Sequence, residues 1–215
     1  MFHAIDYDQW DRKEIYETFN GCLYCLTVDV DVTRFLTSLH ERGLKFYPSL
    51  CWCIAKTANS DRDFRFSKLD GAVGYWEQVN AHYTTRRLDA PHLFTHSVTR
   101  YTEDFSAFYA AFMQDKLNAE HGHSLYCYTE PQPDAVHISI LPHTTQRALS
   151  YSKPNHFTNY DAPNTSYIPF VTVGKYFEQD GRMKLPTTVE FHHAVNDGIH
   201  AEKFFALLET VCDAF

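Results

Sequence analysis

The sequence has no stretch of about 18 consecutive apolar residues, the length that a membrane-crossing helix requires. Its first 14 residues have neither the basic start nor the apolar centre of a secretory signal peptide. Runs of Gly, Ser or Pro that would mark a linker between two halves are also missing. These absences predict one soluble, cytoplasmic domain that spans residues 1–215.

Positive charge is scarce as well, because 19 Lys and Arg residues stand against 27 Asp and Glu residues and give a formal net charge of −8. No run of basic residues interrupts this acidic balance, which argues against non-specific binding of nucleic acid. An anionic cofactor would therefore need a local basic patch. The chain is 44% hydrophobic and 16% aromatic, which is enough apolar material for a sizeable core.

The six cysteines are not spaced for a metal site. Cys22 and Cys25 belong to an alternating segment that reads as a strand, and residues three apart on a strand point to opposite faces. Cys51 and Cys53 follow Pro48 in a predicted helix, where they lie about 200° apart around the axis. We therefore predict free, mostly buried thiols and no bound metal.

The segment 192–198, which reads HHAVNDG, organises the rest of the chain. Residues 187–191 before it alternate as a half-buried strand does, and residues 198–215 after it carry apolar side chains at helical spacing, with Asp197 near the N-cap. Imidazole has an ordinary pKa of about 6.5, so a histidine at a strand end is a candidate proton carrier. We favour His193 over its neighbour. Taken alone, the segment reads more simply as a turn and a helix cap.

Hydrophobic periodicity predicts a chain in which helices and strands are mixed. Helices are expected at 9–18, 33–42, 49–59, 103–120 and 198–215. Strands are expected at 1–8, 22–32, 64–69, 72–76, 82–87, 93–99 and 136–142, and a hairpin of 167–177 with 183–192. The residues 144–165 are polar and rich in turn formers, so they are expected to form a long loop.

The order of a strand, an HHxxxDG segment and an amphipathic last helix, in a chain of this length, resembles the chloramphenicol acetyltransferase family. Condensation domains and dihydrolipoamide acyltransferases carry related segments in longer chains. The resemblance implies an α/β fold of the CoA-dependent acyltransferase type, an α+β two-layer sandwich with a mixed sheet covered by helices. It also implies a homotrimer with its sites at the subunit boundaries.

The resemblance further implies transfer of an acetyl group from acetyl-CoA to chloramphenicol, which inactivates the antibiotic. His193 would act as general base, and Ser139, in the sequence ISILP, would donate a hydrogen bond to the oxyanion, an interaction worth about 3 kcal/mol. Thr172 would hold a water near the transition state. Arg12 would pair with Asp197 to fix the turn. Without the resemblance, Ser139 and Thr172 are ordinary strand residues and Arg12 is a surface charge.

Binding residues follow from the same resemblance. An acceptor pocket is implied at Phe19, Phe94 and Tyr126, and coenzyme A contacts at Lys45, Tyr47, His143, Lys175 and Tyr176. Three features differ from the family pattern: His143 stands where Trp is usual, Thr18 lies near a usual pocket aromatic, and the loop 144–165 is several residues longer. Two alternatives therefore stay open, namely an acetyltransferase for another small alcohol or amine and a noncatalytic trimeric protein that binds small molecules on the same scaffold.

Overall fold

The computed structural model describes residues 1–151 and 160–215. Its helices are α1 (Lys13–Phe19), α2 (Thr33–Arg42), α3 (Phe46–Asn59), α4 (Phe105–Glu120) and α5 (Gly198–Asp213), with a 3-10 turn at Arg62–Phe64. Its strands are β1 (Phe2–Ala4), β2 (Leu23–Asp31), β3 (Phe66–Leu69), β4 (Ala72–Trp76), β5 (Asn80–Arg86), β6 (Phe94–Thr99), β7 (Ala135–Ile140), β8 (Thr165–Ser166), β9 (Phe170–Val173), β10 (Phe177–Gln179) and β11 (Arg182–His192).

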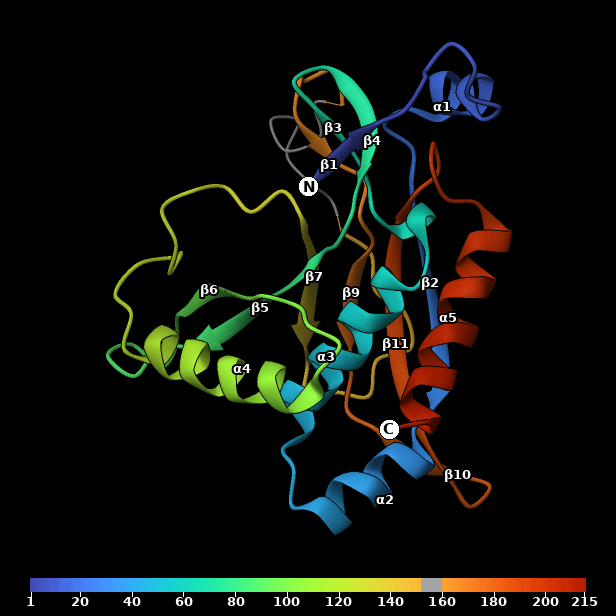
Figure 1. The fold of residues 1–215 in the computed structure, drawn as a ribbon. Helices are drawn as coiled ribbons and strands as arrows, with labels where there is room; N and C mark the ends of the chain where they lie inside the picture. Colours follow the sequence, from blue (N-terminus) through green and yellow to red (C-terminus); the bar gives the residue numbers. More distant parts are fainter. Residues whose placement is uncertain (152–159) are drawn as a thin grey trace.

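The strands form two sheets. The large sheet has seven strands in the order β10-β11-β9-β7-β5-β6, with β2 also paired to β11, and a smaller sheet has the order β1-β4-β3-β8. In the large sheet, β7 pairs in parallel with β5 and with β9, and all the other strand pairs of the sheet are antiparallel. Helices α3, α4 and α5 cover one face of this mixed sheet (Figure 1). The predicted fold, a mixed sheet covered by helices, is confirmed.

The core lies between the large sheet and these helices. Alternate strand residues such as Val136, Ile138, Val171 and Val189 point into it and are at most 2% exposed. Helix α3 is apolar nearly all round, and it begins with Pro48 in its first turn, where the missing N–H has no helical partner to lose. This packing fixes the positions of the strand residues that point the other way.

Several element boundaries differ from the predictions. Helix α1 begins at Lys13 instead of residue 9, so Arg12 lies in the turn before the helix. The strand expected at 167–177 is interrupted between β9 and β10, because the backbone after Pro142 passes close to it there. Lys175 N–H donates a hydrogen bond to Thr144 O at 2.8 Å. A side chain at position 174 would not fit, since a Cβ on Gly174 would lie 2.8 Å from the same oxygen. Part of the expected loop 144–165, residues 152–159, lies outside the described residues.

Cys51, Cys53 and Cys212 are buried free thiols, and Cys22 and Cys127 are exposed free thiols. Cys25 is half-buried in β2. Among the described residues, no group of three His, Cys, Asp or Glu side chains is arranged to hold a metal ion. Within the same ranges, no helix combines the length and the apolar character that crossing a bilayer demands.

Candidate active site

A tight turn carries His193 from the end of β11 to the start of α5. The strand pairs with β2 as far as His192, and His193 N–H then donates to Cys22 O at 2.8 Å. Asp197 is the N-cap of α5, and its carboxylate accepts a hydrogen bond from Ile199 N–H at 3.2 Å. The predicted position of Asp197 at the helix start is thus confirmed, and the cap fixes the far end of the turn.

Arg12 binds this turn at three points. Its Nη1 donates to Asp197 Oδ2 at 3.0 Å, its Nε to Ala194 O at 2.9 Å and its Nη2 to His193 O at 3.2 Å. Burial alone would raise the pKa of Asp197, but hydrogen bonds from His200 and Arg12 outweigh it and lower that pKa to about 2. The carboxylate therefore stays charged near neutral pH, and one guanidinium ties it to the backbone that carries His193.

His200, which the sequence reasoning missed, extends the network. Its Nδ1 lies 2.8 Å from Asp197 Oδ1 and its Nε2 lies 3.5 Å from Asp63 Oδ2. The hydrogen bond to Asp63 is the main cause that raises the pKa of His200, desolvation opposes it, and Asp197 adds to the rise. Its place three residues after the N-cap, where a side chain can return to the cap backbone, is the sequence signal for this role.

Aromatic rings hold the His193 side chain. Phe19 stacks on the imidazole with ring centroids 4.2 Å apart, and Tyr24 meets it edge-on at 5.6 Å. The Nδ1 atom is buried, and no described residue supplies a hydrogen bond to it. Phe19, predicted as a substrate contact, therefore lies directly beside the candidate base, and the two rings restrict the orientation of the imidazole.

Ser139 and Thr172 lie side by side in the middle of the large sheet. They are partners in the parallel register of β7 and β9, and Thr172 is in turn opposite Thr188 of β11. Thr188 shares a hydrogen bond of 2.7 Å with Thr27 of β2. Tyr151 OH lies 2.9 Å from Thr172 Oγ1. A row of hydroxyl groups thus crosses four strands on the face that α3, α4 and α5 do not cover.

One chain does not bring His193 and Ser139 together. Ser139 is level with Thr188 on β11, and the strand runs four more residues to His192 before it reaches the turn. At about 3.4 Å per residue, these four residues span roughly 14 Å along the strand alone. Within one chain, the two side chains are therefore too far apart to contact the same substrate atom.

Ser139 lines a cavity of about 640 Å³ near the ends of β5 and β7. Tyr47, Phe94 and the charged residues Arg86, Lys116 and Glu120 also line it, and the Lys116 ammonium forms an ion pair with the Glu120 carboxylate. Burial raises the pKa of Tyr47, whose hydroxyl donates to Thr84 O at 3.3 Å. Arg86 adds a second positive charge to this wall, and its position was not predicted from the sequence.

The other predicted coenzyme contacts lie outside this cavity. Lys45 is the exposed N-cap residue of α3, and His143 is exposed in the turn after Pro142. Lys175 is exposed, and the Tyr176 ring lies 5.6 Å from that of Phe46. Phe46, which Tyr176 contacts, stands between Lys45 and Tyr47 at the start of α3, so these three predicted residues lie in one region.

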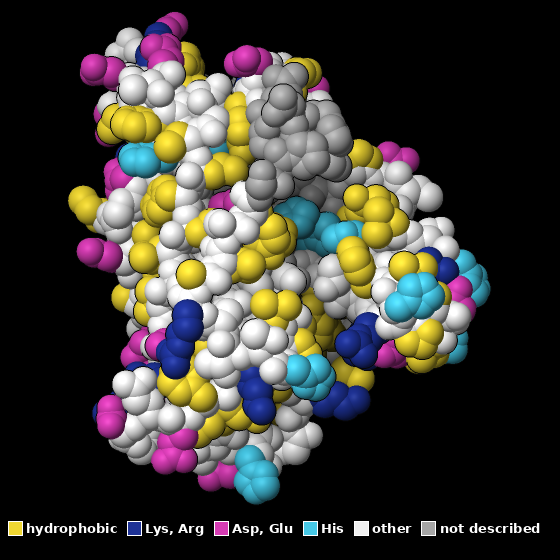
Figure 2. All heavy atoms as spheres, turned by 180° about the vertical axis from the view of Figure 1, so that it is seen from behind, with side chains coloured by type: hydrophobic (Ala, Val, Ile, Leu, Met, Phe, Trp, Pro, Cys, Tyr) yellow, Lys and Arg dark blue, Asp and Glu magenta, His cyan; other side chains and the backbone are white. Residues whose placement is uncertain are grey.

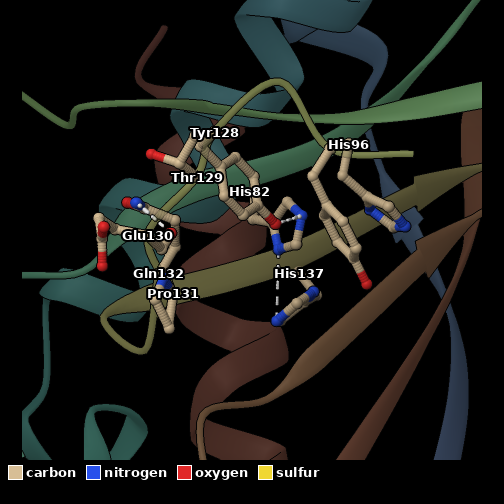
Figure 3. Close-up of a pocket in the computed structure, with 9 residues that line it drawn as sticks. His82, His96, Tyr128, Thr129, Glu130, Pro131, Gln132 and His137 are labelled. Carbon is tan, nitrogen blue, oxygen red and sulfur yellow. Dashed lines mark hydrogen bonds between the residues drawn. The ribbon is translucent and has the colours of Figure 1, made fainter. Parts of the chain in front are cut away.

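A second cavity of about 420 Å³ opens beside β7, lined by His82, His96, His137, Tyr126, Tyr128 and residues 129–132 (Figure 3). His82 Nδ1 lies 3.4 Å from His137 Nε2, and Tyr128 OH lies 3.1 Å from His82 Nε2. Burial, with smaller effects of His137 and His96, lowers the pKa of His82 to about 2, so it is neutral. Figure 2 shows histidine side chains gathered in a hollow on the side seen from behind.

Two of the three aromatic residues predicted for the acceptor pocket, Phe94 and Tyr126, meet at His96. His96 stacks on Tyr126 at 5.1 Å between ring centroids and meets Phe94 edge-on at 5.4 Å. The histidines themselves were not singled out from the sequence. The signal was present for His137, because strand alternation puts it on the same face as Ser139.

The fold is that of CoA-dependent acyltransferases. A solved chloramphenicol acetyltransferase superimposes with a TM-score of 0.84 at 20% identity, covering 98% of this chain and 99% of that one. A dihydrolipoamide acetyltransferase from Azotobacter vinelandii superimposes with a TM-score of 0.65 at 18% identity, covering 93% of this chain and 86% of that one. These likenesses define the class of protein by its fold.

Sequence comparison narrows the class. A family model described as chloramphenicol acetyltransferase matches residues 1–209. A chloramphenicol acetyltransferase of Clostridium perfringens is 32% identical over 95% of this chain and 91% of its own, and chloramphenicol acetyltransferase 2 of Haemophilus influenzae is 30% identical over 99% and 97%. The chain belongs to the chloramphenicol acetyltransferase family, whose members are acyltransferases that use acetyl-CoA as cosubstrate. The resemblance seen in the sequence is confirmed.

Proposed function

We propose that the protein is an acetyl-CoA-dependent O-acetyltransferase that acetylates chloramphenicol and so inactivates the antibiotic. The observation that carries the proposal is the turn at residues 193–197, which Arg12 binds through one carboxylate and two carbonyl oxygens. Such a turn keeps an imidazole in one position, as direct transfer between two bound substrates requires. Acetyl-CoA is a cytoplasmic metabolite, and the proposal assigns the protein to that compartment.

In the proposed reaction, His193 accepts the proton of the acceptor hydroxyl while the oxygen attacks the thioester carbonyl carbon. The Ser139 hydroxyl donates a hydrogen bond to the oxyanion that forms. When the tetrahedral intermediate collapses, the carbon–sulfur bond breaks and the CoA thiolate takes the proton back from His193. Thr172, beside Ser139 in the sheet, holds a water near the intermediate. Arg12 and Asp197 keep their charges and exchange no proton.

The proposed active unit is a homotrimer. Because His193 and Ser139 are separated within one chain, His193 would face Ser139 of a neighbouring subunit. The half-buried position of Ser139 in the wall of a cavity supports this assembly, since a second chain beside that cavity would bring its own strand-end turn towards Ser139. Arg86 in the cavity beside Ser139 would then contact a phosphate of the coenzyme.

The test is release of CoA thiol from acetyl-CoA in the presence of chloramphenicol. For His193→Ala we expect kcat to fall by about 10²- to 10⁴-fold, the usual contribution of a general base. The control is His40→Ala, an exposed histidine on α2, which is expected to leave the rate unchanged. Full activity of His193→Ala would remove that residue from its proposed role.

The alternatives give different results in the same assay. Thiol release with other small alcohols or amines, but not with chloramphenicol, would identify an acetyltransferase with a different acceptor. Binding of chloramphenicol without thiol release from any acceptor would identify a noncatalytic binding protein. Sedimentation of the protein as a monomer at assay concentration, with full activity, would contradict the shared site.

A further inference from the structure

The turn at residues 193–197 is held by a second anchor, the short segment at residues 61–64. Asn196, which is fully buried, donates from Nδ2 to Asp63 O at 2.9 Å. The segment is itself ordered, because the carboxylate of Asp61 caps its 3-10 turn and accepts from Asp63 N–H at 2.9 Å. The turn is therefore bound to a part of the chain that lies 133 positions earlier in the sequence.

His200 joins the same segment to the turn. Its Nδ1 lies 2.8 Å from Asp197 Oδ1, and its Nε2 lies 3.5 Å from Asp63 Oδ2. A neutral imidazole has one N–H and a protonated imidazole has two, so only the protonated ring can donate to both carboxylates at once. The side chain is 19% exposed, so water screens these charges less than it would on the open surface.

Asp197 changes its partners when His200 loses its proton. The N–H of Asp197 lies 3.2 Å from His200 Nδ1, and it can donate to that nitrogen only when the nitrogen carries no hydrogen. In that state Asp197 Oδ1 loses the imidazole donor and keeps Ile199 N–H, while Oδ2 keeps Arg12. The protonation state of His200 therefore decides how the N-cap of α5 is held.

Charged side chains of both signs surround His200. They are Asp63 and Arg62 of the 3-10 turn, Asp11 and Arg12 before α1, Asp197 at the N-cap, and Lys203 of α5, which pairs with Asp61. The hydrogen bond to Asp63 is the main cause that raises the pKa of His200, desolvation opposes it, Asp197 adds to the rise and Arg12 opposes it. The folded protein thus keeps this ring protonated to a higher pH than an unfolded chain does.

We infer that His200 is a positioning residue for the transfer reaction, in which its protonated ring ties the carboxylate of Asp197 to that of Asp63 and so fixes the turn that carries His193. This inference rests on the proposed function, and it adds a residue that supports the general base without touching substrate. Arg12 binds both Asp197 and the carbonyl oxygen of His193, so a displaced Asp197 displaces the imidazole as well. Such a residue affects kcat and leaves substrate binding unchanged.

The test measures kcat and KM from pH 6 to pH 9 by release of CoA thiol with chloramphenicol as acceptor. For His200→Gln we expect kcat at pH 7 to fall by about tenfold, with KM for both substrates unchanged. Wild type should lose activity as the pH rises through the pKa of His200, and His200→Gln should lack this alkaline loss. In Asp63→Asn, which removes the main cause of the raised pKa, the alkaline loss should begin at lower pH.

The matched control is Glu202→Gln, which neutralises an exposed carboxylate on the same helix and should behave as wild type. Full kcat of His200→Gln, or an alkaline loss that it shares with wild type, would overturn the inference and leave acetyl transfer standing. If His200→Gln does not fold, Asp63→Asn decides, because an alkaline loss at the wild-type pH would overturn the inference.

A measurement without substrate separates this inference from the proposed function. Absence of thiol release from wild type would overturn the proposed function. The ring nitrogen resonances of His193, observed by NMR in protein labelled with 15N-histidine, should shift as His200 titrates in wild type, and this shift should be missing in His200→Gln. A His193 ring that does not respond to the titration of His200 would overturn the inference in either case.

Discussion

The two faces of the large sheet differ in composition although the same strands build them. On the face towards α3, α4 and α5, residues such as Val136, Ile138 and Val171 are almost fully buried among apolar side chains. On the opposite face, Ser139 and Thr172 belong to a row of hydroxyl groups. Successive strand residues point to opposite faces, so a single step along β7 changes the surroundings from core to candidate site.

The two faces of the sheet differ in what they contribute: the helix-covered face stabilises the fold, and the opposite face carries the candidate catalytic residues. Burial of apolar side chains contributes about 25 cal/mol for each Å² removed from water, and the aliphatic side chains of the sheet that make up the main core lie on the helix-covered face. On the other face, Thr172 and Thr188 make hydrogen bonds with Tyr151, Thr27 and Gln146, each with a small net effect on folding. Substitutions on that face can therefore change binding and catalysis without unfolding the protein.

The largest expected effect is on the free energy of unfolding, from a residue on the helix-covered face of the sheet. Ile138→Ala removes a side chain that is 2% exposed and should lower the free energy of unfolding by about 2–5 kcal/mol. Ile138→Val, which removes one methylene, should lower it by about 0.5–1.5 kcal/mol. Urea denaturation measures both. A loss below 1 kcal/mol for Ile138→Ala would show that this face of β7 does not support the core as described.

The second largest effect is expected on the reaction rate, from Ser139, which follows Ile138 on β7 and lies on the opposite face of the sheet. Ser139→Ala should lower kcat by about 10²- to 10³-fold, the usual loss when one donor to an oxyanion is removed. The free energy of unfolding should change little, because the side chain lies outside the helix-covered core. CoA thiol release and urea denaturation on the same preparation test both statements. Loss of stability in place of activity would contradict the separation between the two faces.

Local patterns in the sequence predicted much of this arrangement. Strand alternation in residues 136–142 puts Val136, Ile138 and Ile140 on the face opposite Ser139. Val136 and Ile138 are buried in the core, and Ile140 is half-buried against it. The apolar spacing after Asp197 predicted α5 and its cap correctly. These features depend on residues close together in the chain, where the side-chain period alone carries the information.

Contacts between residues far apart in the sequence could not be predicted from local side-chain periodicity. His82 meets His137 only because β5 and β7 pair in parallel across 55 positions of the chain. The contact of Arg12 with Asp197 was expected from the resemblance and not from periodicity. The break after Val173 arises from a loop segment that crosses the strand at Gly174. Such contacts are decided by tertiary packing, which single-sequence patterns do not contain.

The smallest expected effect concerns pH and the network behind His193. Hydrogen bonds to Asp63 and Asp197 raise the pKa of His200 in the folded protein, so its contribution to stability is complete below the unfolded pKa of about 6.5 and is lost as the pH rises through the folded value. The pKa of Asp197 is lowered to about 2, so its contribution is present above about pH 4 and is lost only in acid.

Wild type should therefore be more stable than His200→Gln at pH 6, by on the order of 1 kcal/mol, and the difference should shrink towards pH 9. Urea denaturation at pH 6, 7.5 and 9 measures this. A difference that stays constant or grows with pH would show that the charge on His200 does not stabilise the turn, and the support of His193 would then rest on Arg12 alone.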